Sequence, residues 1–154
     1  MKKLFLILVV LLGLARADSD VKKAVFDLTT PDIARFETRL IKGVAFNNAH
    51  YQTNFKELDI VVIIHGDAYK FFVKDLSKTE CKKDKELEPK AKDIHQRLSS
   101  LVKTYNVKFL MCGAGMKARN ISKENVLEFV EVTPSAIVGL IDAQNDGYAY
   151  IPIN

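Results

Sequence analysis

Residues 58–64 read LDIVVII, and every side chain after Asp59 in this run is β-branched. A continuous β-branched run without polar alternation is typical of a strand that is covered on both faces, as in a parallel sheet between helices. His65 and Gly66 follow the run and end the strand. This stretch therefore favours an α/β fold over an all-β or all-α fold.

Four more apolar runs are spaced along the chain and are separated by helical patterns. We expect strands at 24–28, 107–112, 129–132 and 148–153. Strands that alternate with helices require right-handed crossovers and a mostly parallel sheet. The predicted fold is thus a three-layer α/β/α sandwich with a mostly parallel five-stranded sheet, of the flavodoxin or Rossmann-like type.

The helical patterns show apolar side chains at three- and four-residue spacing. Two such helices are expected at 33–44 and 87–105, and Ser122 is a candidate cap for a further helix. A helix after Thr133-Pro134 is expected to turn four apolar side chains inward: Ile137, Val138, Leu140 and Ile141.

The first 17 residues have the three parts of a cleavable signal peptide. Lys2 and Lys3 precede an uncharged run at 4–14, and Ala15 and Ala17 supply small residues at −3 and −1. An 11-residue helix spans only about 16 Å, roughly half of a bilayer core. We therefore expect residues 1–17 to be removed, residues 18–154 to form one domain, and the protein to be periplasmic or secreted, with no membrane span after cleavage.

Cleavage changes the charge of the domain. The full chain of 154 residues has a net charge of +4, but loss of Lys2, Lys3 and Arg16 leaves 20 basic and 19 acidic residues, a net charge of +1. The basic pI belongs largely to the precursor, so the sequence gives no support for nucleic-acid binding.

Two strands end in chemically useful residues that are followed by glycine. His65-Gly66 ends one strand, and Cys112-Gly113 ends another, with Gly115 close behind. The carboxyl ends of parallel strands meet at one sheet edge, where ligands gather. Backbone N–H groups in the turn after Cys112 would favour its thiolate. Cys112 and His65 are the candidate catalytic residues, and Gly66, Gly113 and Gly115 are the candidate binding residues.

Cys112 has three readings from the sequence alone. It is a reactive thiol, a small core side chain, or the partner of Cys81 in a disulfide, which an oxidising compartment favours. Cys81 would alternatively be a resolving thiol. His50, His65 and His95 lack metal-ligand spacing, and Gly113-x-Gly115-x-x-Ala118 lacks the acidic residue of a dinucleotide site, so no metal or cofactor is predicted.

Four short motifs together resemble the DsrE/DsrF-like family, in its periplasmic branch, over roughly residues 22–153. They are Val61-Val62-Ile63-Ile64-His65-Gly66, Met111-Cys112-Gly113, Val132-Thr133-Pro134-Ser135-Ala136, and Gln144-Asn145-Asp146-Gly147-Tyr148-Ala149-Tyr150-Ile151. The resemblance implies a parallel α/β sandwich and a homo-oligomer, often a trimer or hexamer. In the sulfur-relay members a cysteine carries sulfur as a persulfide, and Cys112 stands at that position.

The expected function is therefore that of an exported sulfur carrier or thiol-redox protein that uses Cys112, with a sulfur-donor or acceptor protein as partner. Sulfur-relay members of the family act in the cytoplasm, so an export signal is a departure from their pattern. The alternative is a non-enzymatic module that binds a small ligand or assembles into an oligomer. A disulfide-stapled structural protein is the third reading.

Overall fold

The computed structural model describes residues 21–79 and 84–154. Cys81 and the predicted signal peptide at 1–17 lie outside the described residues. The strands are β1 (Val21–Leu28), β2 (Glu57–Ile64), β3 (Lys108–Cys112), β4 (Val130–Thr133) and β5 (Ala149–Ile153). The α-helices are α1 (Ile33–Arg35), α2 (Gly43–Thr53), α3 (Ala91–Tyr105), α4 (Gly113–Ala118) and α5 (Ala136–Asn145).

Shorter helical turns complete the described chain. A π-helical segment, η1 (Phe36–Lys42), joins α1 to α2. The 3-10 turns are η2 (Ala68–Phe71), η3 (Leu76–Lys78), η5 (Glu88–Lys90) and η6 (Lys123–Asn125). No helix in the described ranges is both long enough and apolar enough to span a bilayer.

The five strands form one sheet in the order β4-β3-β2-β1-β5. All four strand pairs are parallel, and the register pairs Ile64 with Met111 and Cys112 with Thr133. The predicted parallel five-stranded sheet is confirmed. Because the strands are parallel, His65 and Cys112 come at the carboxyl ends of neighbouring strands, β2 and β3.

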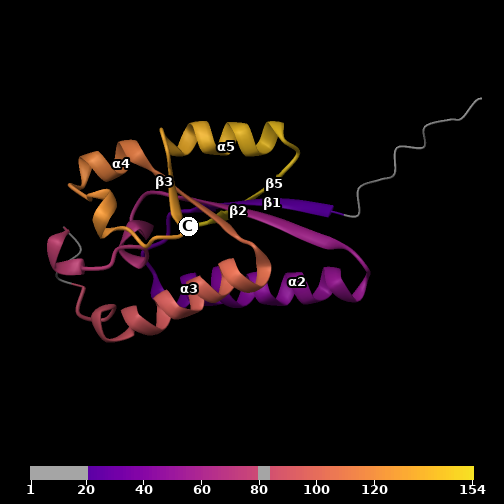
Figure 1. Ribbon diagram of the computed structural model, residues 1–154, viewed down its shortest axis with the longest axis horizontal. Helices are drawn as coiled ribbons and strands as arrows, with labels where there is room; N and C mark the ends of the chain where they lie inside the picture. Colours follow the sequence, from indigo (N-terminus) through magenta and orange to yellow (C-terminus); the bar gives the residue numbers. More distant parts are fainter. Residues whose placement is uncertain (1–20, 80–83) are drawn as a thin grey trace, which may run out of the picture.

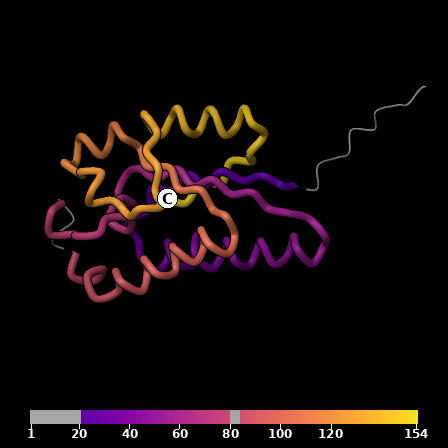
Figure 2. Tube along the Cα trace, viewed as in Figure 1, coloured from indigo at the N-terminus to yellow at the C-terminus, as the bar shows by residue number. Residues whose placement is uncertain are grey.

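Helices cover the sheet on both sides, as the predicted sandwich requires. Figure 1 shows α2 and α3 below the sheet and α5 above it. The tube in Figure 2 follows the chain from β3 straight into α4, which lies on the same side as α5. The segment after β2 instead leads to α3 on the opposite side. The segments that follow β2 and β3 therefore turn to opposite faces of the sheet beside Cys112. Ligands of parallel sheets bind where neighbouring connections diverge in this way.

Aromatic packing fixes the segment that follows β2. The rings of Phe36 and Phe71 stack with centroids 4.0 Å apart, and Phe72 packs on Phe109 of β3 at 5.3 Å. Phe71 and Phe72 are fully buried. Turn η2 is therefore anchored in the core, and this anchoring holds Tyr69, two residues earlier, at the carboxyl edge of the sheet.

The expected inner face of α5 is wrong for Ile137, Val138 and Ile141, whereas Leu140 packs against the core as predicted. Ile137 is 70% exposed and Ile141 is 51% exposed, whereas Ala136, Gly139 and Ala143 face the core. The backbone of α5 lies close to the sheet, because a Cβ atom at Gly139 would come within 2.9 Å of Ile63 Cδ1. Small residues permit this approach and turn the larger side chains outward.

Two local expectations around β4 also differ from the structure. Gly113 and Gly115 do not form an open turn, because they belong to the first turn of α4. The helix expected after Ser122 is only the single turn η6. The backbone amide groups near Cys112 are thus supplied by a helix start rather than by a loop.

Candidate functional site

Cys112 ends β3 and is also the N-cap residue of α4. Its Sγ atom accepts a hydrogen bond from the Gly115 amide at 3.4 Å, in the position that a serine or aspartate oxygen takes in a common cap. Among the described residues the Cys112 thiol has no disulfide partner, and the residue is only 7% exposed. The sulfur atom therefore lies at the start of a helix, just below the protein surface.

The amide of Ala136, at the start of α5, also acts on the Cys112 sulfur. The Ser135 hydroxyl caps this helix by accepting from the Val138 amide at 3.2 Å. Burial by itself raises the pKa of Cys112. The amide of Gly115, the hydroxyl of Tyr69 and the amides of Ala136 and Ala114 lie around the sulfur, and together they outweigh burial and lower this pKa below its ordinary value. The site thus favours a thiolate, as helix N-termini do elsewhere.

Tyr69 is a site residue that the sequence did not indicate. Its hydroxyl donates a 2.8 Å hydrogen bond to the carbonyl oxygen of Cys112, and the residue is 1% exposed. Burial first, and then contact with Cys112, raises the pKa of Tyr69, so the phenol is neutral across the physiological range. Tyr69 and Cys112 are 43 residues apart in the chain, and no local pattern could have paired them.

Gly115 leaves room for the Tyr69 hydroxyl. A Cβ atom at position 115 would lie 2.0 Å from this oxygen. At Gly113 a Cβ atom would come within 3.0 Å of Val132 Cγ1. Both candidate binding glycines therefore allow other groups to pack closely around Cys112.

Arg119 holds Tyr69 from the solvent side. The guanidinium group lies 5.1 Å from the centre of the Tyr69 ring, a cation–π contact. Arg119 also pairs with Asp67 at 3.4 Å. This pair links the segment after β2 to the end of α4, on either side of the cysteine.

The imidazole of His65 is paired with Asp27 of β1. Its Nε2 atom lies 2.5 Å from Oδ1 of Asp27 on β1, and the Tyr150 hydroxyl donates to Oδ2 of the same carboxylate at 2.5 Å. A carboxylate only accepts, so the Nε2 atom of His65 is the donor in this contact. The role of His65 as a proton acceptor for Cys112 stays a prediction.

Gly66 makes the turn that follows His65. It has a φ of +62°, and a Cβ atom there would come within 3.1 Å of Thr29 Cβ. The turn is closed by a hydrogen bond from the Ala68 amide to the His65 carbonyl at 3.2 Å, and the Asp67 amide ties it to the Thr29 carbonyl after β1. Gly66 therefore shapes the chain between His65 and Tyr69.

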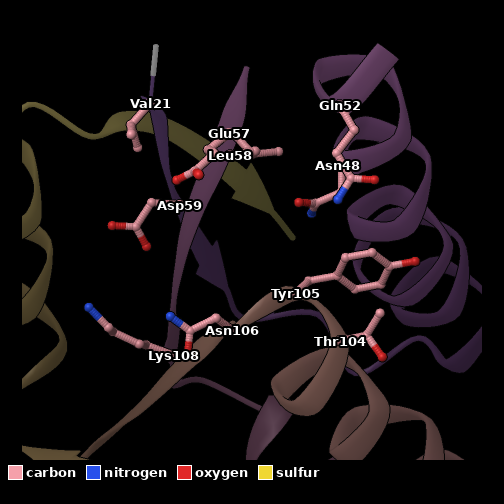
Figure 3. Close-up of a pocket in the computed structure, with 10 residues that line it drawn as sticks. All are labelled: Val21, Asn48, Gln52, Glu57, Leu58, Asp59, Thr104, Tyr105, Asn106 and Lys108. Atoms are coloured by element: carbon pink, nitrogen blue, oxygen red, sulfur yellow. The ribbon is translucent and has the colours of Figure 1, made fainter. Parts of the chain in front are cut away.

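A pocket of about 400 Å³ lies at the opposite, amino edge of the sheet. Figure 3 shows Asp59 and Lys108 on one side of it and Asn48, Gln52 and Tyr105 on the other. It is remote from Cys112 because it is built where β1, β2 and β3 begin. Among residues 21–79 and 84–154, no group of three His, Cys, Asp or Glu side chains is arranged to hold a metal ion.

Comparisons with known proteins bear on the family and the fold of the chain. The model of the DsrE/DsrF-like family matches residues 23–153. An uncharacterized protein of Aquifex aeolicus (strain VF5) is 32% identical over an alignment of 154 positions that covers 99% of this chain, and this chain spans 64% of the length of that curated relative. A solved structure, the protein of unknown function MTH1491 from Methanobacterium thermoautotrophicum, has the same fold, with a TM-score of 0.59 at 20% identity, over 85% of this chain and 98% of that one.

Proposed function

Because the chain belongs to the DsrE/DsrF-like family, we propose that it carries sulfur on Cys112, or undergoes reversible thiol oxidation there. The observation that supports this proposal is the set of hydrogen-bond donors around the sulfur. The Gly115 amide contacts Sγ at 3.4 Å, and further donors from α4, α5 and Tyr69 lower the pKa of the thiol. A thiolate is the nucleophilic form of cysteine.

The transfer step balances without an external oxidant. The Cys112 thiolate attacks the terminal sulfur of a donor persulfide, R–S–SH. A new S–S bond forms at Sγ while the S–S bond of the donor breaks, and the donor leaves as the thiolate R–S⁻. The transferred sulfur keeps its hydrogen, so the product is a Cys112 persulfide. In the thiol-oxidation variant, attack on a disulfide yields a mixed disulfide and one thiolate.

His65 is the proposed proton acceptor when the Cys112 thiol ionises. The two residues lie at the carboxyl ends of neighbouring strands, and the contact with Asp27 orients the His65 ring. Cys81 is the proposed resolving thiol, or the disulfide partner, of Cys112. We further propose that residues 1–17 direct export to the periplasm or the medium, and that a sulfur-donor or acceptor protein is the partner.

Intact-mass measurement of the protein purified from its own compartment tests these points together. Loss of residues 1–17 would report export, and an added mass of one sulfur atom would report the persulfide. Cys112→Ser should lose the added sulfur, whereas Cys81→Ser should keep it. A wild-type protein that gains no sulfur after incubation with a persulfide donor, and forms no disulfide with a disulfide donor, would contradict the proposal.

A second candidate function is a non-enzymatic assembly module, and the exposed apolar stripe of α5 favours it. Ile137, Val138 and Ile141 share this exposed face. A contact with a neighbouring copy of the chain would bury it, and the family resemblance implies trimers or hexamers. Under this hypothesis Cys112→Ser keeps the oligomer and Ile137→Glu loses it in sedimentation, while sulfur loading is absent throughout.

A further inference from the structure

The hydroxyl of Tyr69 lies between two acceptors that belong to one residue. It donates to the carbonyl oxygen of Cys112 at 2.8 Å. It also occupies the space beside Gly115, where a Cβ atom would lie only 2.0 Å from the hydroxyl oxygen. Gly115 is the residue whose amide donates to Sγ, and the Tyr69 hydroxyl is close enough to the Cys112 side chain to lower the pKa of the thiol.

The ring of Tyr69 is held in place, while its hydroxyl hydrogen can rotate. The residue is buried, Arg119 lies over the ring face, and Asp67 fixes Arg119. A hydroxyl hydrogen turns to suit its acceptors. Rotation about the C–O bond therefore redirects the hydrogen bond without moving any heavy atom.

The carbonyl of Cys112 does not depend on Tyr69 alone. As the N-cap residue of α4, Cys112 has a carbonyl that accepts the first hydrogen bond within the helix. If the hydroxyl turns away, this carbonyl still has a donor. The Tyr69 hydrogen bond is thus available for another acceptor at little cost.

We propose that Tyr69 is a switchable donor, which binds the Cys112 carbonyl when the sulfur is a thiol and turns to Sγ when the sulfur is a thiolate. Hydrogen bonds to a charged acceptor are about twice as strong as neutral ones, and a buried anion needs them. This inference rests on the proposed function for its purpose, since the switch would stabilise the attacking sulfur and release it once a new bond to Sγ removes the charge.

Ionisation of Cys112 in a Tyr69→Phe variant tests the switch. The protein with Tyr69 and the Tyr69→Phe variant would both carry Cys81→Ser. The ultraviolet absorbance of the thiolate would be followed against pH, with Cys112→Ala as the blank. We expect Tyr69→Phe to raise the Cys112 pKa by about one unit, which means about tenfold less thiolate at a pH below both values. Tyr105→Phe, at the end of α3, is the matched control and should change nothing. An unchanged Cys112 pKa in Tyr69→Phe would overturn the proposal.

A second measurement covers the case in which Tyr69→Phe does not fold. With ¹³Cζ-labelled tyrosine in the Cys81→Ser protein, the Tyr69 resonance should shift at the pH where Cys112 ionises. The same resonance should stay constant over that range in Cys112→Ser. A Tyr69 signal that ignores Cys112 ionisation would show a fixed donor to the carbonyl. Neither experiment uses a sulfur donor, so failure of sulfur loading would count against the proposed function alone.

Discussion

The amide nitrogen of Gly115 lies 3.4 Å from Sγ of Cys112, so the Cys112 side chain caps the N-terminus of helix α4. This relationship couples the charge of one side chain to the stability of the fold. The folded pKa of Cys112 is lowered below its ordinary value of 9.0, with burial opposing and the Gly115, Tyr69, Ala136 and Ala114 hydrogen bonds prevailing.

Stability should therefore depend on pH through Cys112. A depressed folded pKa contributes stability that is complete above the unfolded pKa and is lost as pH falls through the folded value. We expect the free energy of unfolding of the Cys81→Ser protein, relative to the same protein with Cys112→Ala, to grow as pH rises towards 9. Urea unfolding of both proteins across this range measures it. A difference that does not vary with pH would contradict a native thiolate.

Gly115→Ala should destabilise the protein although alanine is the better helix former. The new Cβ atom would lie 2.0 Å from the Tyr69 hydroxyl, and overpacking of this kind costs about 1–3 kcal/mol. The matched control is Gly43→Ala in α2, where the nearest atom, the Thr38 carbonyl oxygen, is 3.5 Å away. That change should stabilise by about 0.5–1 kcal/mol. Thermal unfolding separates them, and a stabilised Gly115→Ala would refute the close contact.

Asp59→Asn should lower the pKa of Tyr148. Burial, and then the 2.5 Å hydrogen bond to Asp59 and the charge of that carboxylate, raise the pKa of Tyr148 to about 12. Removing the charge should bring the value part of the way back towards 10.0, with burial keeping it higher. The phenolate absorbance during alkaline titration measures the shift, with Tyr148→Phe identifying the signal. An identical titration in Asp59→Asn would contradict the contact.

The orientation of α5 can be tested with two substitutions on opposite faces. Ile137 is exposed, so Ile137→Ser should change the monomer's free energy of unfolding by less than about 0.5 kcal/mol. Ala143 is buried, so Ala143→Leu should cost about 1–3 kcal/mol through overpacking. Denaturant unfolding at low protein concentration compares them. A large loss of stability in Ile137→Ser with little loss in Ala143→Leu would instead support the inward-facing Ile137 that the sequence predicts.

The apolar runs and the helical patterns that separate them were enough to predict the α/β class and the parallel five-stranded sheet. The run 58–64 became β2, with strands paired in parallel on both sides. The orientation of α5 was missed because Ile137, Val138 and Ile141 form an apolar stripe that looks like an inner face, whereas Gly139 lets the backbone itself approach Ile63. Periodicity reports where apolar residues lie on a helix and does not say which face the sheet takes.

The candidate site was accessible from the sequence only where its parts are local. Cys112, Gly113 and Gly115 lie close together in the sequence, which indicated a cysteine beside backbone amides. In the structure the Gly115 amide contacts the Cys112 sulfur. Tyr69 and the Asp27 partner of His65 come from other strands or turns, 43 and 38 residues away from the residues that they contact. Only the three-dimensional register of the sheet brings such partners together.

The donors around Cys112 come from α4, from α5 and from the turn after β2, three segments that meet only when the sheet is assembled. A chain that has not yet folded therefore carries an ordinary, weakly acidic sulfhydryl, and the acidity is acquired together with the tertiary structure. In the Cys81→Ser protein, a dye that reacts with thiolates would consequently report folding, through the assembly of the segments around Cys112.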